Sequence, residues 1–409
     1  MRTRLVAVGT LCLLFSTFPA SAARLDLVPS VSIEQEYDSN VFNTDGNEKE
    51  DFILHVTPAI TLSLKMPETT LSLRTSITSD NYFRYTEQNT MAAAIFLAIG
   101  ASPISLTPRL SVSPSGYFVR SQDSYRRTQL VPTGDPLVPT TIVAEDQAQT
   151  TRDYGGSLRA TYLVTPKVDF SLGGGFTTRQ YLDNVSASDS DSKVATGDAT
   201  LAYRFTPVLS SGFFYNTSLN NYKQGVDSRV HSMGVAGAYR YSPSVSLSAR
   251  AGVARTEESS PSGIDSTTWD PIGSLTMEYV VEDSRSPAQA KREFRSKLNL
   301  TVDQVGGGGY GLTTRRHAAT FSIGDRYAPE WWLDLWARYE YNVSLDAAQS
   351  EDIRSATGTA GLAYQPAVWA TFRLSGTAFR QWSYGTIGTD LVRYSAFLGI
   401  TFGKEYNLY

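Results

Sequence analysis

The stretch "WWLDLWARYEYNVSL", residues 331–345, alternates between two kinds of side chain along its whole length. Its odd positions are apolar or aromatic, whereas its even positions include Asp334, Arg338 and Glu340. A period of two residues indicates a β-strand with two different faces. Strands of soluble proteins average about 5–6 residues, so a two-faced strand of this length is unusual in a globular protein.

The same alternation recurs from the start of the chain to its end. An even number of strands is typical of single-chain bacterial β-barrels. We expect about 18 strands (16–18 range), near residues 30–38, 52–64, 70–85, 92–102, 109–120, 151–164, 168–181, 194–205, 208–222, 231–241, 244–256, 271–282, 293–304, 312–325, 331–345, 353–364, 368–381 and 391–403.

The connections between these segments alternate in length. Every second one is short and carries proline, as at Pro166, Pro207 and Pro329, whereas the others are longer and polar, as in "NTDGNEKED" and "SASDSDSK". Outer-membrane barrels have short turns at the periplasmic end and longer loops at the outer end. The sequence therefore predicts an all-β fold, a transmembrane antiparallel up-and-down β-barrel.

The cost of charge in hydrocarbon decides which face of each strand points outward. Arginine or lysine on the lipid face costs about 2–4 kcal/mol at the middle of the bilayer. The charged face of residues 331–345 must therefore point into the lumen. The longest later apolar run, "AAAIFLAIGA" at residues 92–101, is too short for a membrane helix, which needs about 20 residues.

The first residues are typical of a secretory signal, because Arg2 and Arg4 precede an apolar run that ends in small residues. We expect residues 1–22 to be a signal peptide, cleaved near Ala22, and residues 23–409 to form the barrel domain. The loop at residues 121–149 is the longest, and we expect its apolar pieces and prolines to fold it into or across the mouth.

The composition argues against disulfides, a lipid anchor and a nucleic-acid partner. The only cysteine, Cys12, lies within the signal, so the mature chain is expected to have no disulfide and no lipid anchor. The 36 basic and 40 acidic residues give a formal charge of −4, which gives no sign of a nucleic-acid partner.

The residues on the polar faces are the candidates for a functional site. Their arginines would bind acidic groups of a passing polymer, and their aromatic rings would offer faces to sugars. The alternative is a solvated wall in which charges of both signs pair. The predicted lumen-lining residues are Arg74, Tyr82, Arg84, Tyr117, Arg159, Arg204, Arg250, Arg295, Asp334, Trp336, Arg338, Glu340, Trp369, Arg373 and Arg393.

Metal and enzyme sites find little support in the sequence. The acids around "EYDSNVF", residues 36–42, lack the spacing of the helix-flanked calcium loop, so an Asx-type turn after an interfacial tyrosine is the simpler interpretation. The three histidines, His55, His231 and His317, are not at metal-ligand spacing. A lipase-like site around His317 stays an alternative. We expect no enzyme, no cofactor and no metal.

"EYDSNVF" shortly after a signal peptide, followed by hairpins to the end of the chain, resembles the beta-barrel porin-2 family of Gram-negative outer membranes. The resemblance implies a location in the outer membrane and an association with exopolysaccharide or capsule export systems. It supplies no catalytic residues.

The first expectation for function is thus an outer-membrane pore that exports an exopolysaccharide or capsule polymer. The alternatives are a general or sugar-selective diffusion porin and a non-conducting surface or scaffold barrel. The expected partners are outer-membrane lipid, the barrel-assembly machinery and a periplasmic polysaccharide-export protein. The sequence does not set the oligomeric state.

Overall fold

The structure is a computed structural model that describes residues 24–66, 70–99, 104–121, 151–182, 191–223, 227–259, 265–283, 292–305, 314–344, 352–385 and 390–408. The expected signal peptide at residues 1–22 and, apart from Ser121, the long loop at residues 121–149 lie outside these ranges.

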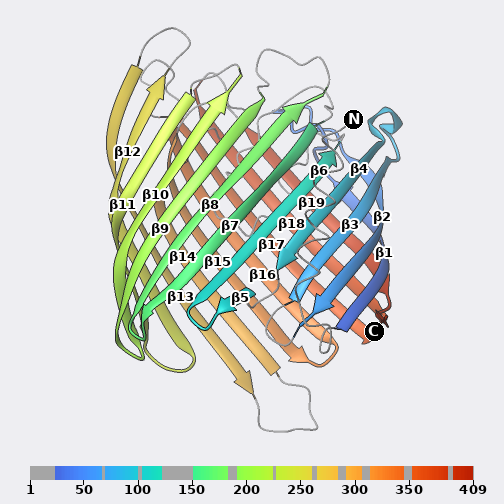
Figure 1. Ribbon diagram of the computed structural model, residues 1–409. Coiled ribbons are helices and arrows are strands. Elements are labelled where there is room, and N and C mark those ends of the chain that lie inside the picture. The colour runs from blue at the N-terminus through green and yellow to red at the C-terminus, as the bar shows by residue number, and fades with distance from the viewer. Residues whose placement is uncertain are drawn as a thin grey trace, which may run out of the picture.

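The described residues form β-strands almost throughout, and the long antiparallel strands stand side by side with a common tilt (Figure 1). The strands are β1 Arg24–Asp38, β2 Asp51–Lys65, β3 Thr70–Tyr82, β4 Thr90–Ile99, β5 Ile104–Thr107, β6 Leu110–Ser121, β7 Thr151–Thr165, β8 Val168–Tyr181, β9 Ser192–Thr206, β10 Leu209–Tyr222, β11 Asp227–Arg240, β12 Val245–Ser259, β13 Asp265–Asp283, β14 Arg292–Val305, β15 Thr314–Ala328, β16 Trp331–Ser344, β17 Asp352–Ala367, β18 Ala370–Tyr384, β19 Leu391–Gly403 and β20 Tyr406–Asn407. A single 3₁₀ turn, η2 Thr86–Gln88, is the only helical element in the described ranges.

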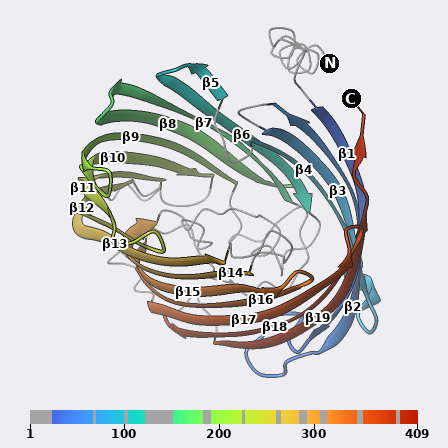
Figure 2. The ribbon, with the colours of Figure 1, turned by 90° about the horizontal axis from the view of Figure 1, so that it is seen from below.

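Strand pairing closes the sheet into a ring. Each long strand pairs antiparallel with the next one in the chain, and β1 pairs with both β2 and β19. The short strand β5 pairs only with β6, beside the β4–β6 contact. The end view shows the strands arranged around one ring (Figure 2). The predicted antiparallel barrel is confirmed, and within the described ranges eighteen long strands, β1–β4 and β6–β19, form its wall.

The end of the chain continues the wall. β20 pairs with β1 through Leu27 and Tyr406, in the same register as the pair Ser30 and Gly403 of β1 and β19. β20 therefore continues the line of β19 along β1 with no change of register. Only Lys404 and Glu405 separate the two strands.

The register places apolar side chains on the outer face of the barrel and most polar side chains on its inner face. On the outer face, large apolar side chains are open to the surroundings, such as Leu201, Phe213 and Leu398, which are 46%, 67% and 62% exposed. A closed barrel with such an outer face has the architecture of outer-membrane proteins, because hydrocarbon requires every backbone group to be paired. The chain is therefore a transmembrane β-barrel of the outer-membrane type. No helix of the described residues is long and apolar enough to cross a membrane.

Aromatic rings gather on the outer face near both ends of the strands. At the end with the short turns, Trp331 stacks on Tyr364 with ring centroids 4.4 Å apart, and Tyr364 lies 6.4 Å from Phe372. At the opposite end, called here the loop end, Tyr37 lies 5.3 Å from Phe52. Two such belts mark the two membrane interfaces.

The expected strand boundaries differ from the observed ones mainly at the ends. β1 begins at Arg24 and not near residue 30, and β13 begins at Asp265 and not near residue 271. Pro366 lies inside β17, at an irregularity between Tyr364 and Ala367, and was expected in the turn. Prolines at such irregular sites remove a donor that the ladder does not use.

The faces of β9 yield a test of the barrel. Leu201 points outward in the middle of the strand, and its neighbour Thr200 points inward. Leu201→Arg is expected to lower the free energy of unfolding by about 2–4 kcal/mol, because it places a charge in hydrocarbon. Thr200→Arg is expected to change it little. Urea unfolding in lipid vesicles measures both, and equal effects would contradict the assigned faces.

Candidate functional site: the inner wall of the barrel

Burial along the inner face changes from one end of the barrel to the other. On β12, the inward-facing Ala254 and Thr256 near the loop end are each 1% exposed, whereas the inward-facing Ser248 and Arg250 farther down are exposed. On β16 the inward-facing Glu340 is 0% exposed and Asp334 is exposed. The lumen is thus filled at the loop end and more open toward the short turns.

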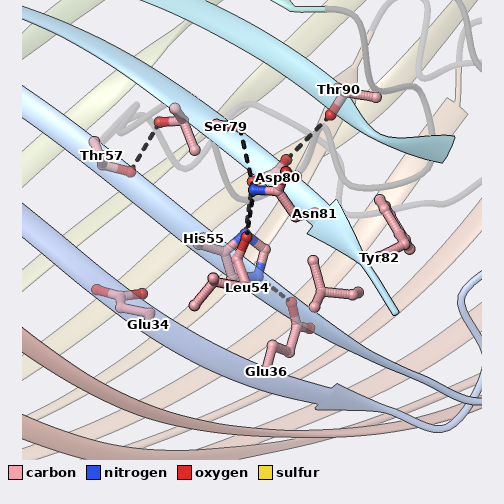
Figure 3. A network of polar contacts seen from close by, with 12 residues as sticks. Glu34, Glu36, Leu54, His55, Thr57, Ser79, Asp80, Asn81, Tyr82 and Thr90 are labelled. Atoms are coloured by element: carbon pink, nitrogen blue, oxygen red, sulfur yellow. Dashed lines mark hydrogen bonds and ion pairs between the residues drawn. The ribbon is translucent and has the colours of Figure 1, made fainter. Parts of the chain in front are cut away.

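His55 of β2 lies between two carboxylates in the filled half (Figure 3). Its Nδ1 is 2.6 Å from Asp80 Oδ1 on β3, and its Nε2 is 2.8 Å from Glu36 Oε2 on β1. The Thr90 hydroxyl donates to Asp80 Oδ2 at 3.4 Å. Ionised carboxylates only accept hydrogen bonds. One proton must therefore lie between His55 and Asp80, and another between His55 and Glu36. The three groups together then carry one negative charge.

Arg393 joins its strand, β19, to this cluster. Its guanidinium donates to both carboxylate oxygens of Asp38, at 3.1 and 2.6 Å, and its Nη2 is 3.8 Å from Glu36 Oε1. It also donates to Asn43 Oδ1 at 3.4 Å. Such a two-point contact fixes the geometry of a guanidinium and a carboxylate. The cluster therefore ties the last long strand to the first.

The segment after β1 folds inward over this cluster. The Asn40 backbone N–H donates to Asp38 Oδ1 at 2.9 Å, which is an Asx turn, and Val41 packs on Ile53 and Tyr82. Asn43 has a φ of 52°, a left-handed conformation that asparagine tolerates well. The expected Asx turn is confirmed. Apart from the outward-facing Tyr37, "EYDSNVF" is thus a structural element of the inner wall and does not extend away from the barrel.

A second buried cluster spans β14–β16. Arg316 is 1% exposed and donates to both oxygens of Asp303, at 2.9 and 2.6 Å. Its Nη1 lies 3.9 Å from Glu340 Oε1, and Arg338 Nη2 contacts the same oxygen. Buried charges are tolerated only when they are paired in this way.

On β7–β9 the inner charges form a ladder of pairs, of which one crosses β8 from β7 to β9 and the other joins the adjacent strands β8 and β9. Arg159 Nη2 is 3.0 Å from Asp198, and Arg204 Nη2 is 2.5 Å from Asp169. Their arginine side chains are 55% and 51% exposed. This ladder is the salt-bridged wall that the sequence left open as the alternative to a polymer-binding surface.

The structure places most of the predicted lumen residues on the inner face. Tyr117 donates to Thr177 at 3.4 Å, and Tyr82 is buried beneath Val41. By register, the inward-facing members of the predicted set are Arg74, Tyr82, Tyr117, Arg159, Arg204, Arg250, Arg295, Asp334, Trp336, Arg338, Glu340, Arg373 and Arg393.

Two predicted lumen residues lie elsewhere. Trp369 lies in the turn between β17 and β18 and stacks on the outward Phe402 with ring centroids 6.1 Å apart, so it belongs to the outer aromatic belt. Arg84 lies beyond the end of β3, at the rim, where it pairs with the exposed Glu50 at 2.9 Å. A hydrogen bond from Tyr37, together with Arg84, holds the pKa of Glu50 below its usual value. The two-residue alternation predicted the wrong position for both residues, because β3 ends before Arg84 and β17 ends before Trp369.

The three histidines have different surroundings. His55 was not predicted as a site residue, although counting from Asp51 places it on the inner face of β2. His231 and His317 face outward, where His231 Nδ1 is 2.8 Å from the Tyr215 hydroxyl and His317 lies 5.8 Å from the Tyr341 ring. No group of side chains suited to hold a metal ion occurs in the described ranges.

The chain is similar to one known family over part of its length. A family model described as "Putative MetA-pathway of phenol degradation" matches residues 139–265, which is less than half of the chain. No curated protein matches the chain.

Similar solved structures include two proteins of Pseudomonas aeruginosa and one of Acinetobacter baumannii. OpdK, solved with vanillate, has 11% identity and a TM-score of 0.42, and the match covers 94% of this chain and 99% of that chain. OccK2 (OpdF), solved in complex with glucuronate, has 10% identity, a TM-score of 0.42, and coverage of 95% and 98%. OccAB4 of Acinetobacter baumannii has 11% identity, a TM-score of 0.43, and coverage of 95% and 100%.

The Arg393 cluster predicts a large effect on stability. Arg393→Gln leaves Asp38 and Glu36 buried without their guanidinium, which is expected to cost about 3–5 kcal/mol of the free energy of unfolding. Arg373→Gln, on the neighbouring strand and exposed to the lumen, is the matched control and is expected to leave stability nearly unchanged. Denaturant unfolding measures the difference, and equal stabilities would show that the cluster is not needed to hold the wall together.

Proposed function

We propose that the chain forms a narrow outer-membrane channel through which small polar solutes diffuse. A ring of 16–18 strands is wide enough to leave an aqueous channel, and eighteen long strands form this one. The observation that supports small solutes most directly is the filled loop end of the lumen, where inward-facing charges are buried and paired.

The exposed inner cations support a preference among solutes. Arg74 and Arg373 face the lumen in its more open part, and neither forms an ion pair with a described acidic residue. Free guanidinium groups attract anions and bind carboxylates in a planar, two-point geometry. Small organic acids are therefore the solute class that this wall fits best.

Polymer export has less support. The association with exopolysaccharide rests on the resemblance at residues 36–42 alone, and no comparison with known proteins adds to it. A polymer would also need a wide passage at both ends of the barrel, whereas the inner wall is packed at one of them. A general or solute-selective diffusion channel fits these observations better.

Planar-bilayer recording and liposome swelling test the proposal. The purified barrel is expected to give discrete conductance steps and to admit monosaccharides and small carboxylates faster than oligosaccharides. A barrel that gives no conductance would be a scaffold. A deletion strain that loses its surface polysaccharide while its uptake of small solutes is unchanged would contradict the proposal and favour polysaccharide export.

Ion selectivity tests the role of the inner arginines. The double variant Arg74→Glu and Arg373→Glu is expected to shift the reversal potential in a salt gradient toward cation selectivity, because charged side chains that line a pore select ions. Arg380→Glu is the control, since Arg380 lies on the same strand as Arg373 but faces outward. Equal shifts from both variants would place the selectivity outside the lumen.

A further inference from the structure

The outer face of β6–β8 carries a row of donor side chains near the loop end. Arg120 of β6 stands directly opposite Arg152 of β7, and Arg152 stands directly opposite Gln180 of β8. The three strands lie side by side in the wall (Figure 1). All three side chains point away from the lumen, because their neighbours Val119, Asp153 and Arg179 face inward.

This row has an excess of positive charge. Like charges directly opposite each other on a sheet destabilise the pair, and no described acidic residue forms an ion pair with Arg120 or Arg152. On the other side of Arg120, the register partner on β4 is Ala93. The carboxylate of Asp191, before β9, is engaged with Lys223 at 3.7 Å.

Other outward arginines near the loop end either stand beside an acidic residue or stand alone. Arg255 pairs with Glu257 at 2.6 Å, and Arg354 pairs with Asp352 at 3.3 Å. Arg380 has no ion pair with a described acidic residue either, but its register partners are Ala356 and Val392. The pair on β6 and β7 is therefore distinguished because two arginines stand opposite each other with no acidic partner among the described residues. An anion from outside the chain would balance it.

The surface below the row is apolar. Phe118 and Tyr154 form the next outward row, and the rows beneath end at Leu110, Tyr162 and Phe170. The eight residue steps from Phe118 to Leu110 extend about 26 Å along the strand, which corresponds to roughly 20 Å of depth at the tilt of about 35–45° usual in such barrels. Two cations above an apolar surface of this depth match a charged headgroup above lipid chains.

We infer that Arg120 and Arg152 bind a phosphate of a phosphorylated lipid in the leaflet at the loop end, and that Gln180 donates to the same headgroup. A guanidinium presents two parallel donors that suit phosphate oxygens. Two such groups face each other here across a single pair of strands. If the loop end faces the cell exterior, as the loop lengths predict, the lipid is the phosphorylated glycolipid of the outer leaflet.

Lipid retention in nanodiscs tests this site. The barrel is placed in phosphatidylcholine discs that contain bisphosphorylated lipid A or the same lipid with its phosphates removed, and bound lipid is counted by native mass spectrometry. The original chain is expected to retain the bisphosphorylated form, and the double variant Arg120→Gln and Arg152→Gln to retain about tenfold less, because charge-assisted contacts are lost. The dephosphorylated form is expected to be retained by neither.

The variant Arg354→Gln is the matched control, an outward arginine near the same end that already has an acidic partner, and it is expected to retain lipid A as the original chain does. Equal retention by the double variant, or equal retention of the dephosphorylated lipid, would overturn the inference. If the double variant does not fold, as judged by heat-dependent gel mobility, the single variant Arg152→Gln decides by the same measurement. Conductance is independent of this site, so a failure here leaves the proposed channel untouched.

Discussion

The structure depends on the requirement that every backbone N–H and C=O group in hydrocarbon find a partner within the protein. A sheet meets this requirement only by closing on itself, and the pairing of β1 with both β2 and β19 does so. Closure then fixes the rest of the design. Alternate side chains must face lipid or lumen, so apolar residues such as Leu201 lie outside and charged residues such as Arg204 lie inside.

The second constraint is the burial of charge in the inner wall, where buried acids and bases must be paired. Near the loop end the acids and bases are largely withdrawn from water, and each buried cluster contains both signs. Arg393 with Asp38, and Arg316 with Asp303, are held by two-point contacts. Farther down, where water reaches the wall, arginines such as Arg373 remain open to the lumen. The same residue type thus stabilises the wall at one depth and is available to solutes at another.

Much of the fold could be predicted from period-two alternation, because a lipid face tolerates so few charges that the pattern is nearly unbroken. The positions of most inner residues followed from counting along each strand. Counting could not show where a strand ends, which is why Arg84 and Trp369 were placed in the lumen. It also could not show partners from distant strands, so the contacts that join His55 to Glu36 and Asp80, and Asp38 to Arg393, were found only in the structure.

The seam between the first and last strands has a consequence for how the molecule is made. Residues near position 30 must meet residues near position 403, so the ring cannot be completed while the ribosome still holds the carboxyl end. Contacts so far apart in sequence are slow to form because loop-closure entropy opposes them. Until they form, β1 and β19 each present an open edge that could pair with another chain. Closure of the seam therefore removes the two edges at which the unfinished barrel is open to wrong pairing.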